Sequence, residues 1–251
     1  MCLIAWNWQP ASPTPMLLIA NRDEFYARPT QALHWWDGGK TLAGRDLQAG
    51  GTWLGINRSG RLAALTNHRN PSVIRPDAPS RGELVTAFLQ DDVSAPNYLM
   101  TLAQRAADYN PFNLLVYDGT HFMGLESRHA RVFAIAPGVG AVSNADFDTA
   151  WPKLTELTQN LQTLIDQGQA SDARLLALLA NRRKAPDPDL PKTGVPLHIE
   201  RTLSATFIAT PDYGTRACSV LRLETGHARF LEKSFGASGS LGESQFSFAL
   251  E

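Results

Sequence analysis

The chain opens with Met1-Cys2, and a cysteine in second place can become an N-terminal nucleophile. Starting methionines are commonly removed before a small side chain, so the mature chain would begin at Cys2 with a free amine and a thiol on one residue. A terminal amine has a pKa of about 7.7–8.0 and a thiol one of about 8.5, so the amine can serve as the base for its own thiol. The opening therefore predicts chemistry in which a cysteine attacks a carbonyl carbon.

Polar side chains that suit this chemistry stand where predicted strands end or loops follow, which is where catalytic groups often collect. They are Arg22, Asp23 and Glu24 in "ANRDEF", Asn67 in "LTNHR", Asn144 in "VSNADFD" and Arg216 in "YGTRACS". A positive charge favours a thiolate, and side-chain amides can bind an oxyanion. Each also has an ordinary interpretation: an inert cysteine, a structural Arg–Asp ion pair, turn asparagines and a surface arginine. Taken together, the residue types favour attack on an amide or thioester.

The elements that must position these groups begin with strands. Apolar runs over 2–8 and 16–25 flank the turn-rich "QPASPTP" and predict an opening hairpin with the cysteine at its start. Two further runs, 53–56 and 62–66, surround Asn57-Arg58-Ser59-Gly60, a typical turn between antiparallel strands. Later strands are predicted in "FNLLVYDG", "HFMGLES", "ARVFAIA", "TFIAT", "ACSVLRLE" and "HARFLEKSF".

Four helices are expected between these strands. Ser80 followed by Glu83 suggests a capping box for the first helix, and the second is predicted over 94–109. The spacing of Leu154, Leu157, Leu161 and Ile165 predicts a third, and Ser171 is expected to cap a fourth that runs to Leu179. Because strands and helices are segregated, the pattern favours an α+β fold with antiparallel sheets. The Pro-rich stretch 182–196 is read as a surface loop, so residues 1–251 are predicted to form one domain.

Composition excludes several classes of protein. The 251 residues carry a formal net charge of −1, which argues against nucleic-acid binding, and no apolar stretch approaches the roughly 20 residues of a membrane span. No signal-peptide pattern is present, so a cytoplasmic protein is expected. Two cysteines cannot build a disulfide scaffold or a cysteine zinc site, although a bond between Cys2 and Cys218 stays open. No metal or organic cofactor is expected.

The motifs also carry a family resemblance. "ANRDEF" close behind Cys2, followed by "AGGTWLGIN", "LTNHRNP", "SNADFDTAWPK" and "YGTRACSVL", resembles the NRDE-domain family, also called the transport and Golgi organisation protein family. The order of motifs is similar to that of the cysteine N-terminal nucleophile hydrolases, such as bile-salt hydrolases and penicillin V acylases. The resemblance implies a four-layer αββα sandwich in which the N-terminal cysteine opens a strand of the central sheets.

Carried over residue by residue, the resemblance also implies a set of roles. Cys2 would be the nucleophile with its own amine as base, Arg22 would lie beside the thiolate, and Asp23 would orient the amine. Asn67 and Asn144 would bind the oxyanion, and Arg216 would support the site. In the hydrolases the acidic residue follows the arginine by three positions, whereas here Asp23 and Glu24 follow directly. Either carboxylate could therefore orient the amine, and Asp23 converges with Arg22 only if a bulge or turn intervenes.

The resulting hypothesis is a hydrolase or acyltransferase for a non-peptide linear amide or thioester. The alternative is a carrier on the same fold for a hydrophobic ligand such as haem or a lipid or acyl-CoA, to which the family has been linked. The chain has six histidines but no haem-attachment motif, and a lone His68 is expected to be structural. Trp35 and Trp36 are expected to fill the core. The sequence leaves open whether the chain forms a homo-oligomer.

Overall fold

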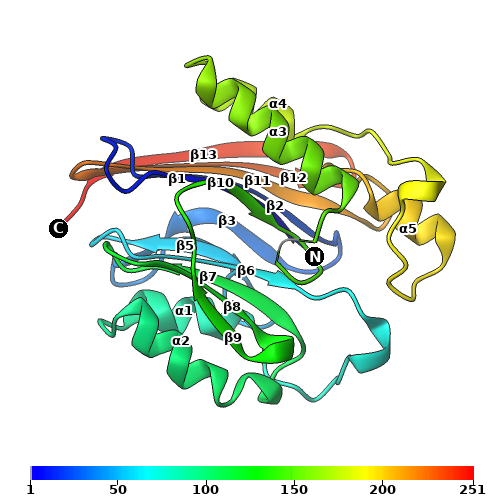
Figure 1. Ribbon diagram of the computed structural model, residues 1–251, viewed down its shortest axis with the longest axis horizontal. Helices are drawn as coiled ribbons and strands as arrows, with labels where there is room; N and C mark the ends of the chain where they lie inside the picture. The colour runs from blue at the N-terminus through cyan, green and yellow to red at the C-terminus, as the bar shows by residue number, and fades with distance from the viewer. Residues whose placement is uncertain (1, 148) are drawn as a thin grey trace.

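Two antiparallel β-sheets stack face to face in the computed structural model, which describes residues 2–147 and 149–251 (Figure 1). Met1 and Asp148 lie outside the described residues. The predicted removal of Met1 therefore also falls outside them. The first sheet has the strand order β10 (Gly138–Val142), β1 (Cys2–Trp8), β2 (Met16–Phe25), β11 (Tyr213–Glu224), β12 (His227–Gly236) and β13 (Gly239–Ala249). The second has the order β3 (Thr30–Trp35), β4 (Thr41–Asp46), β5 (Leu54–Asn57), β6 (Leu62–Asn67), β7 (Phe112–Tyr117), β8 (Phe122–Glu126) and β9 (Arg131–Ala134).

Helices cover the outer face of each sheet. Helices α3 (Pro152–Asp166) and α4 (Asp172–Leu179) lie on the first sheet, and α1 (Gly82–Gln90) and α2 (Ala95–Ala103) lie on the second. Helix α5 (Leu197–Leu203) lies beside the sandwich, near the ends of the strands (Figure 1). The order helix, sheet, sheet, helix confirms the predicted four-layer αββα sandwich. Among the described residues, no helix is both long and apolar enough to cross a membrane.

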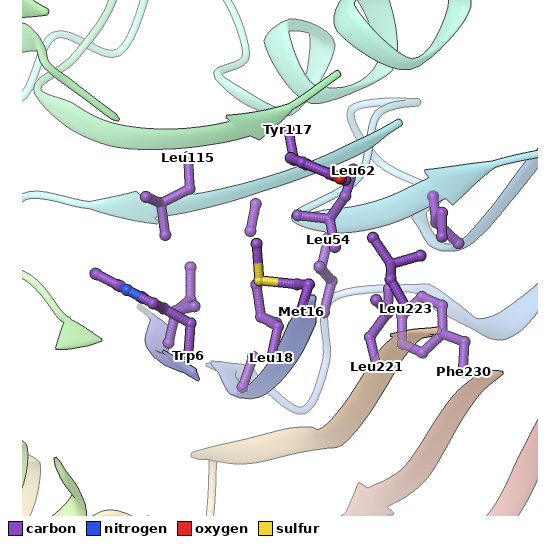
Figure 2. Close-up of a cluster of buried hydrophobic side chains, with 14 of the residues drawn as sticks. Trp6, Met16, Leu18, Leu54, Leu62, Leu115, Tyr117, Leu221, Leu223 and Phe230 are labelled. Carbon is purple, nitrogen blue, oxygen red and sulfur yellow. The ribbon is translucent and has the colours of Figure 1, made fainter. Parts of the chain in front are cut away.

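The strands β1 and β2 are nearly continuous apolar runs, and both of their faces are buried. Trp6, Met16 and Leu18 point into the core between the sheets, where they meet side chains such as Leu54 and Leu115 (Figure 2). Their sequence neighbours, including Leu3, Ala5, Leu17 and Ile19, point the other way and pack against α3 and α4. Successive strand residues face opposite sides, so a nearly continuous apolar run is what a doubly covered strand requires.

The structure confirms most of the expected elements and corrects three of them. Helix α1 begins at Gly82 without a side-chain cap, because the Glu83 carboxylate accepts a hydrogen bond from the Tyr109 hydroxyl instead of closing a capping box. The helix predicted over 94–109 ends at Ala103 and is followed by a short 3₁₀ turn. The stretch "TFIAT" forms only an isolated bridge, because the Thr206 carbonyl accepts a hydrogen bond from the side chain of Asn21.

Several elements had no clear signal in the sequence. Strand β13 contains two glycines and many polar residues and is largely exposed, yet it pairs with β12 along its length. The strand is held by main-chain hydrogen bonds to β12, and these do not require apolar side chains in β13. Strands β3, β4 and β10 and helix α5 were likewise not predicted. Trp36 is buried and Trp35 packs against Phe248, as expected for core tryptophans.

Candidate active site

Cys2 lies at the first position of β1, directly opposite Arg22 in β2. Residues opposite each other in an antiparallel pair project to the same face of the sheet, so the thiol and the guanidinium group are neighbours. Cys2 is only 7% exposed, and this burial raises the pKa of its thiol, which the charge of Arg22 opposes. An ionised thiol at this position therefore needs nearby positive charge.

The Arg22 guanidinium group is held on three sides. Its Nη1 donates to the Thr30 hydroxyl over 3.1 Å, and Nη2 lies 3.8 Å from the Asp46 carboxylate. Its plane stacks on the Trp53 ring, 4.3 Å from the ring centre. Thr30 and Asp46 belong to β3 and β4, and Trp53 immediately precedes β5, so the second sheet orients an arginine that the first sheet carries.

Asp23 is buried and lies opposite Thr215 of β11, whose hydroxyl donates to Oδ1 over 2.7 Å. Burial raises the pKa of Asp23, while Lys153 and the hydrogen bond from Thr215 lower it. The pairing of β2 with β11 shifts between Thr215 and Ala217, which leaves Arg216 as an extra residue in a bulge. β2 runs as one strand from Met16 to Phe25, and the bulge lies in β11 rather than between Arg22 and Asp23. The bulge or turn that the sequence analysis required between these two residues is therefore not found there, although both residues line the cavity beside Cys2.

Asn67 and Asn144 are in contact, but only Asn67 lines the cavity beside Cys2. The Asn144 side-chain amide donates to the main-chain carbonyl of Asn67 over 2.8 Å. The hydroxyl of Ser143 donates to the carbonyl of Cys2 over 3.1 Å, so this loop also holds the first strand. Asn67 lines the cavity beside Cys2, whereas Asn144 is fully buried and positions the Asn67 backbone.

Arg216 holds the turn after β2 through hydrogen bonds and is not among the residues that line the cavity beside Cys2. Its Nη1 donates to the main-chain carbonyls of Phe25, Tyr26 and Arg28, and its Nε donates to that of Phe235. Glu24, the other candidate carboxylate, is only partly buried and lies 4.0 Å from Arg28. Asp23 is thus the more enclosed of the two acids.

Three residues of the site were missed by the sequence analysis. Lys153 of α3 is buried with Nζ donating to the Leu203 carbonyl, and burial lowers the pKa of Lys153 to about 8. Behind it, Arg69 and Glu200 form a buried ion pair with a 2.9 Å contact. Lys153 had a usable signal, since it stands four and eight residues before Leu157 and Leu161 on the buried helix face.

The two cysteines are free, which excludes the disulfide that the sequence left open. Cys2 belongs to the core between the sheets and Cys218 to the core under α3 and α4, so they lie on opposite faces of the first sheet. Burial raises the pKa of the Cys218 thiol far above its usual range. Cys218 is therefore a packing residue.

Two cavities adjoin each other near Cys2. The first, the Cys2 cavity, has a volume of about 390 Å³, and Cys2, Arg22, Asp23 and Asn67 are among the residues that line it. The second, the apolar cavity, has a volume of about 440 Å³, and its apolar lining includes Phe25, Pro71, Ile74, Ile199 and Leu203. The residues that line both are Glu24, Asn67, Ile74, Arg81 and Asn110, so the two spaces share a wall.

A possible metal-binding group lies outside these cavities. One ligand atom each from Glu126, His129 and Asp146 fall within 4.8 Å of one another. Both carboxylates are already paired, Glu126 with Arg131 at 2.9 Å and Asp146 with Arg128 at 3.1 Å. A metal ion here would have to displace two arginine ion pairs, so the donor set does not favour one.

Comparison with known proteins defines the class of this fold. A solved structure of a mutant of the conjugated bile acid hydrolase from Clostridium perfringens aligns with a TM-score of 0.54 over 99% of this chain and 92% of that chain, at 11% sequence identity. Two stacked antiparallel sheets between helices, with a cysteine opening the first strand, thus form an N-terminal nucleophile hydrolase fold. At this identity the likeness concerns the fold alone.

The sequence relatives identify the family. The model of the family "Transport and Golgi organisation 2" matches residues 1–237, and the chain belongs to this family. The homologue from Bos taurus is 36% identical and the one from Homo sapiens 34%, each over 93% of both chains. The Drosophila melanogaster protein is 29% identical over 97% of this chain and 95% of its own. The resemblance seen in the sequence motifs is therefore confirmed.

Proposed function

We propose that the protein is a cysteine-dependent hydrolase or acyltransferase that acts on a non-peptide linear amide or thioester. One observation carries the proposal: Cys2, Arg22, Asp23 and Asn67 come from three strands and line one cavity. A nucleophile, a cation, a buried carboxylate and an amide are the groups that acyl transfer through a cysteine requires. The family and the fold are consistent with this chemistry. Experiments on this protein itself are needed to test it.

The reaction follows from the position of each group. The Cys2 sulfur attacks the carbonyl carbon of the substrate, and the carbon–nitrogen or carbon–sulfur bond of the substrate then breaks. In this proposal Met1 is removed, the Cys2 amine takes the thiol proton and passes it to the leaving group, and Asp23 orients that amine. Water or another acceptor then attacks the acyl-enzyme, releases the acyl group and restores the thiol.

The remaining groups stabilise charge. Arg22 opposes the effect of burial on Cys2 and favours the thiolate. Asn67 lines the same cavity, where its side-chain amide would donate to the oxyanion. Asn144 and Arg216 are positioning residues, because they hold the Asn67 backbone and the turn after β2. Loss of one oxyanion donor typically lowers kcat by about 10²–10³. We expect Asn67→Ala to fall in that range and Asn144→Ala to affect the site through Asn67.

The test begins with the intact mass and with brief labelling by a thiol-directed electrophile near neutral pH. We expect a chain without Met1, labelled at Cys2 and not at Cys218. A panel of acyl anilides and acyl thioesters of increasing chain length then identifies a substrate, and Cys2→Ala should abolish its turnover. Cys218→Ala is the matched control and should retain turnover. Retention of Met1, or full turnover by Cys2→Ala, would overturn the mechanism.

A second candidate is a carrier for a hydrophobic ligand such as haem, a lipid or an acyl-CoA. The apolar cavity favours it, because Phe25, Ile74 and Leu197 are strongly exposed and two of them line that cavity. His68 also lines it, with Nε2 3.3 Å from the Asp146 carboxylate. A carrier would bind haemin or a fatty acyl probe equally well as wild type and as Cys2→Ala, and would turn over none of the panel.

A further inference from the structure

A third cavity is lined by Arg22 and has a volume of about 320 Å³. We call it the Glu232 cavity, and its lining includes Arg22, Trp53, Arg216, Glu232 and Glu243. Arg22 and Trp53 also line the Cys2 cavity, so this stacked pair is shared by the two spaces. Its size is that of a pocket for a small molecule, since such pockets begin at about 300 Å³.

Glu232 is the unusual member of this lining. It is 2% exposed, and its Oε1 accepts a hydrogen bond from the main-chain nitrogen of Leu33 over 2.8 Å, which joins the two sheets. The Ser234 hydroxyl donates to the same Oε1 over 3.5 Å, and Ser219, which lies opposite Glu232 in the β11–β12 pair, lowers the pKa of the carboxyl through its hydroxyl. The other oxygen, Oε2, is buried and makes no hydrogen bond of normal length to the residues that the structure describes. Buried carboxylate oxygens are rarely left in this state, because the lost hydration is not replaced. A ligand that donates a hydrogen bond would satisfy it.

The arginines restrict what that ligand can be. Arg22 and Arg216 line the same cavity, and they would repel a molecule that is only a cation. Glu232 would equally repel a molecule that is only an anion. A molecule with a positive group at one end and a negative group at the other can pair with Glu232 and with the arginines at the same time. Trp53 and Phe235 provide an apolar surface in the same cavity.

We propose that the Glu232 cavity is a binding site for a small zwitterion, an α-amino acid, whose ammonium group donates to Glu232 and whose carboxylate faces Arg22 and Arg216. The ligand would contact the Arg22–Trp53 pair, which also lines the Cys2 cavity. The proposal concerns binding alone and does not rest on the proposed reaction. Its success or failure can therefore be measured whether or not the protein turns over an acyl substrate.

The affinity should depend on pH through Glu232. Burial raises the pKa of Glu232 to about 7, and the charged groups that line the same cavity are Arg22, Arg216 and the exposed Glu243. An ammonium group binds the ionised carboxylate, so affinity rises with pH as Glu232 loses its proton. From pH 8 to pH 6 the ionised fraction falls about tenfold, and we expect the affinity to fall by about the same factor.

Calorimetric titration of the full chain with free α-amino acids tests the site. L-valine has two matched partial ligands: isobutylamine lacks its carboxylate, and isovalerate lacks its ammonium group. We expect at least one amino acid to bind, with each of its partial ligands bound at least about tenfold more weakly. Absence of binding by every amino acid would overturn the proposal, and equal binding of the amine alone would overturn the role of the arginines.

Two variants separate a specific site from a general effect on the fold. Glu232→Gln keeps the acceptor for Leu33 and should weaken binding and remove its dependence on pH. Glu243→Gln makes the same change at the exposed rim of the cavity and should leave binding unchanged. Ala32→Phe fills the cavity without altering either acid and should abolish binding while the circular dichroism spectrum is retained. Unchanged binding by folded Glu232→Gln would contradict the assignment.

Discussion

The buried ion pair between Arg69 and Glu200 permits a quantitative test of how the site is supported. Both side chains are 4% exposed, Nη1 lies 2.9 Å from Oε2, and Glu200 also accepts hydrogen bonds from Thr193. Arg69 follows β6 and Glu200 lies in α5, so the pair joins α5 to the sandwich. Arg69 further stacks on Trp151, 4.6 Å from the ring centre.

We expect Arg69→Met to be strongly destabilising. Removing one partner of a buried pair leaves the other charge without compensation, which costs about 3–5 kcal/mol of unfolding free energy. For a chain of this size each kcal/mol lowers the melting temperature by about 2–4 °C, so the expected decrease is about 6–20 °C. The loss should be measured by urea unfolding monitored by circular dichroism, with a thermal melt as a second readout.

The controls isolate the effect of burial. Arg183 pairs with Glu156 at 2.7 Å but is 71% exposed, so Arg183→Met should cost at most about 1 kcal/mol. The double variant Arg69→Met with Glu200→Gln leaves no unpaired charge and should recover part of the stability lost by the single variant. If Arg69→Met costs no more than Arg183→Met, the pair does not stabilise the fold and this reasoning is refuted.

Three further predictions follow from individual contacts. Gly44→Ala would place a methyl group against the Trp53 ring, and we expect a loss of about 1–3 kcal/mol in a thermal melt; an unchanged melting temperature would contradict this packing. Thr215→Val removes the hydroxyl that donates to buried Asp23 and should cost about 1–3 kcal/mol in urea unfolding, whereas a neutral result would mean that the bond is not needed. Burial raises the pKa of Glu232 from an ordinary 4.5 to about 7, so the folded state binds more protons than the unfolded state between these values and wild type loses stability as pH rises through them. Glu232→Gln should therefore match wild type near pH 4 and exceed it by about 3 kcal/mol above pH 7, and a constant difference across this range would disprove the titration.

The strands that carry Cys2 and Arg22 were predictable from the sequence. Runs such as "CLIAWNW" and "MLLIANRDEF" are short, mostly apolar and separated by a turn-rich stretch, and these features are local properties of the chain. The helix of Leu154 to Ile165 was predictable for the same reason, since its spacing marks one buried face. In contrast, "TFIAT" has a strand-like composition but forms no strand, because the side chain of Asn21 takes the Thr206 carbonyl.

The candidate site was only partly accessible to sequence reasoning. Residue types and family motifs selected Cys2, Arg22, Asp23 and Asn67, but nothing in the sequence could place them in one cavity. Their roles in catalysis, like the cytoplasmic location and the single-domain organisation, stay predictions.

By itself, the sequence determined the apolar periodicities, the order of motifs, the family and a cysteine at the start of the first strand. These are local or ordered features, and each can be read within a short window of residues. The tertiary structure alone decided that Arg216 holds a turn while Asn144 supports Asn67, and that Glu232 is buried in the wall of a cavity that Arg22 also lines. Such assignments depend on sheet register, on a bulge in β11 and on burial, which arise only when segments far apart in the chain pack together.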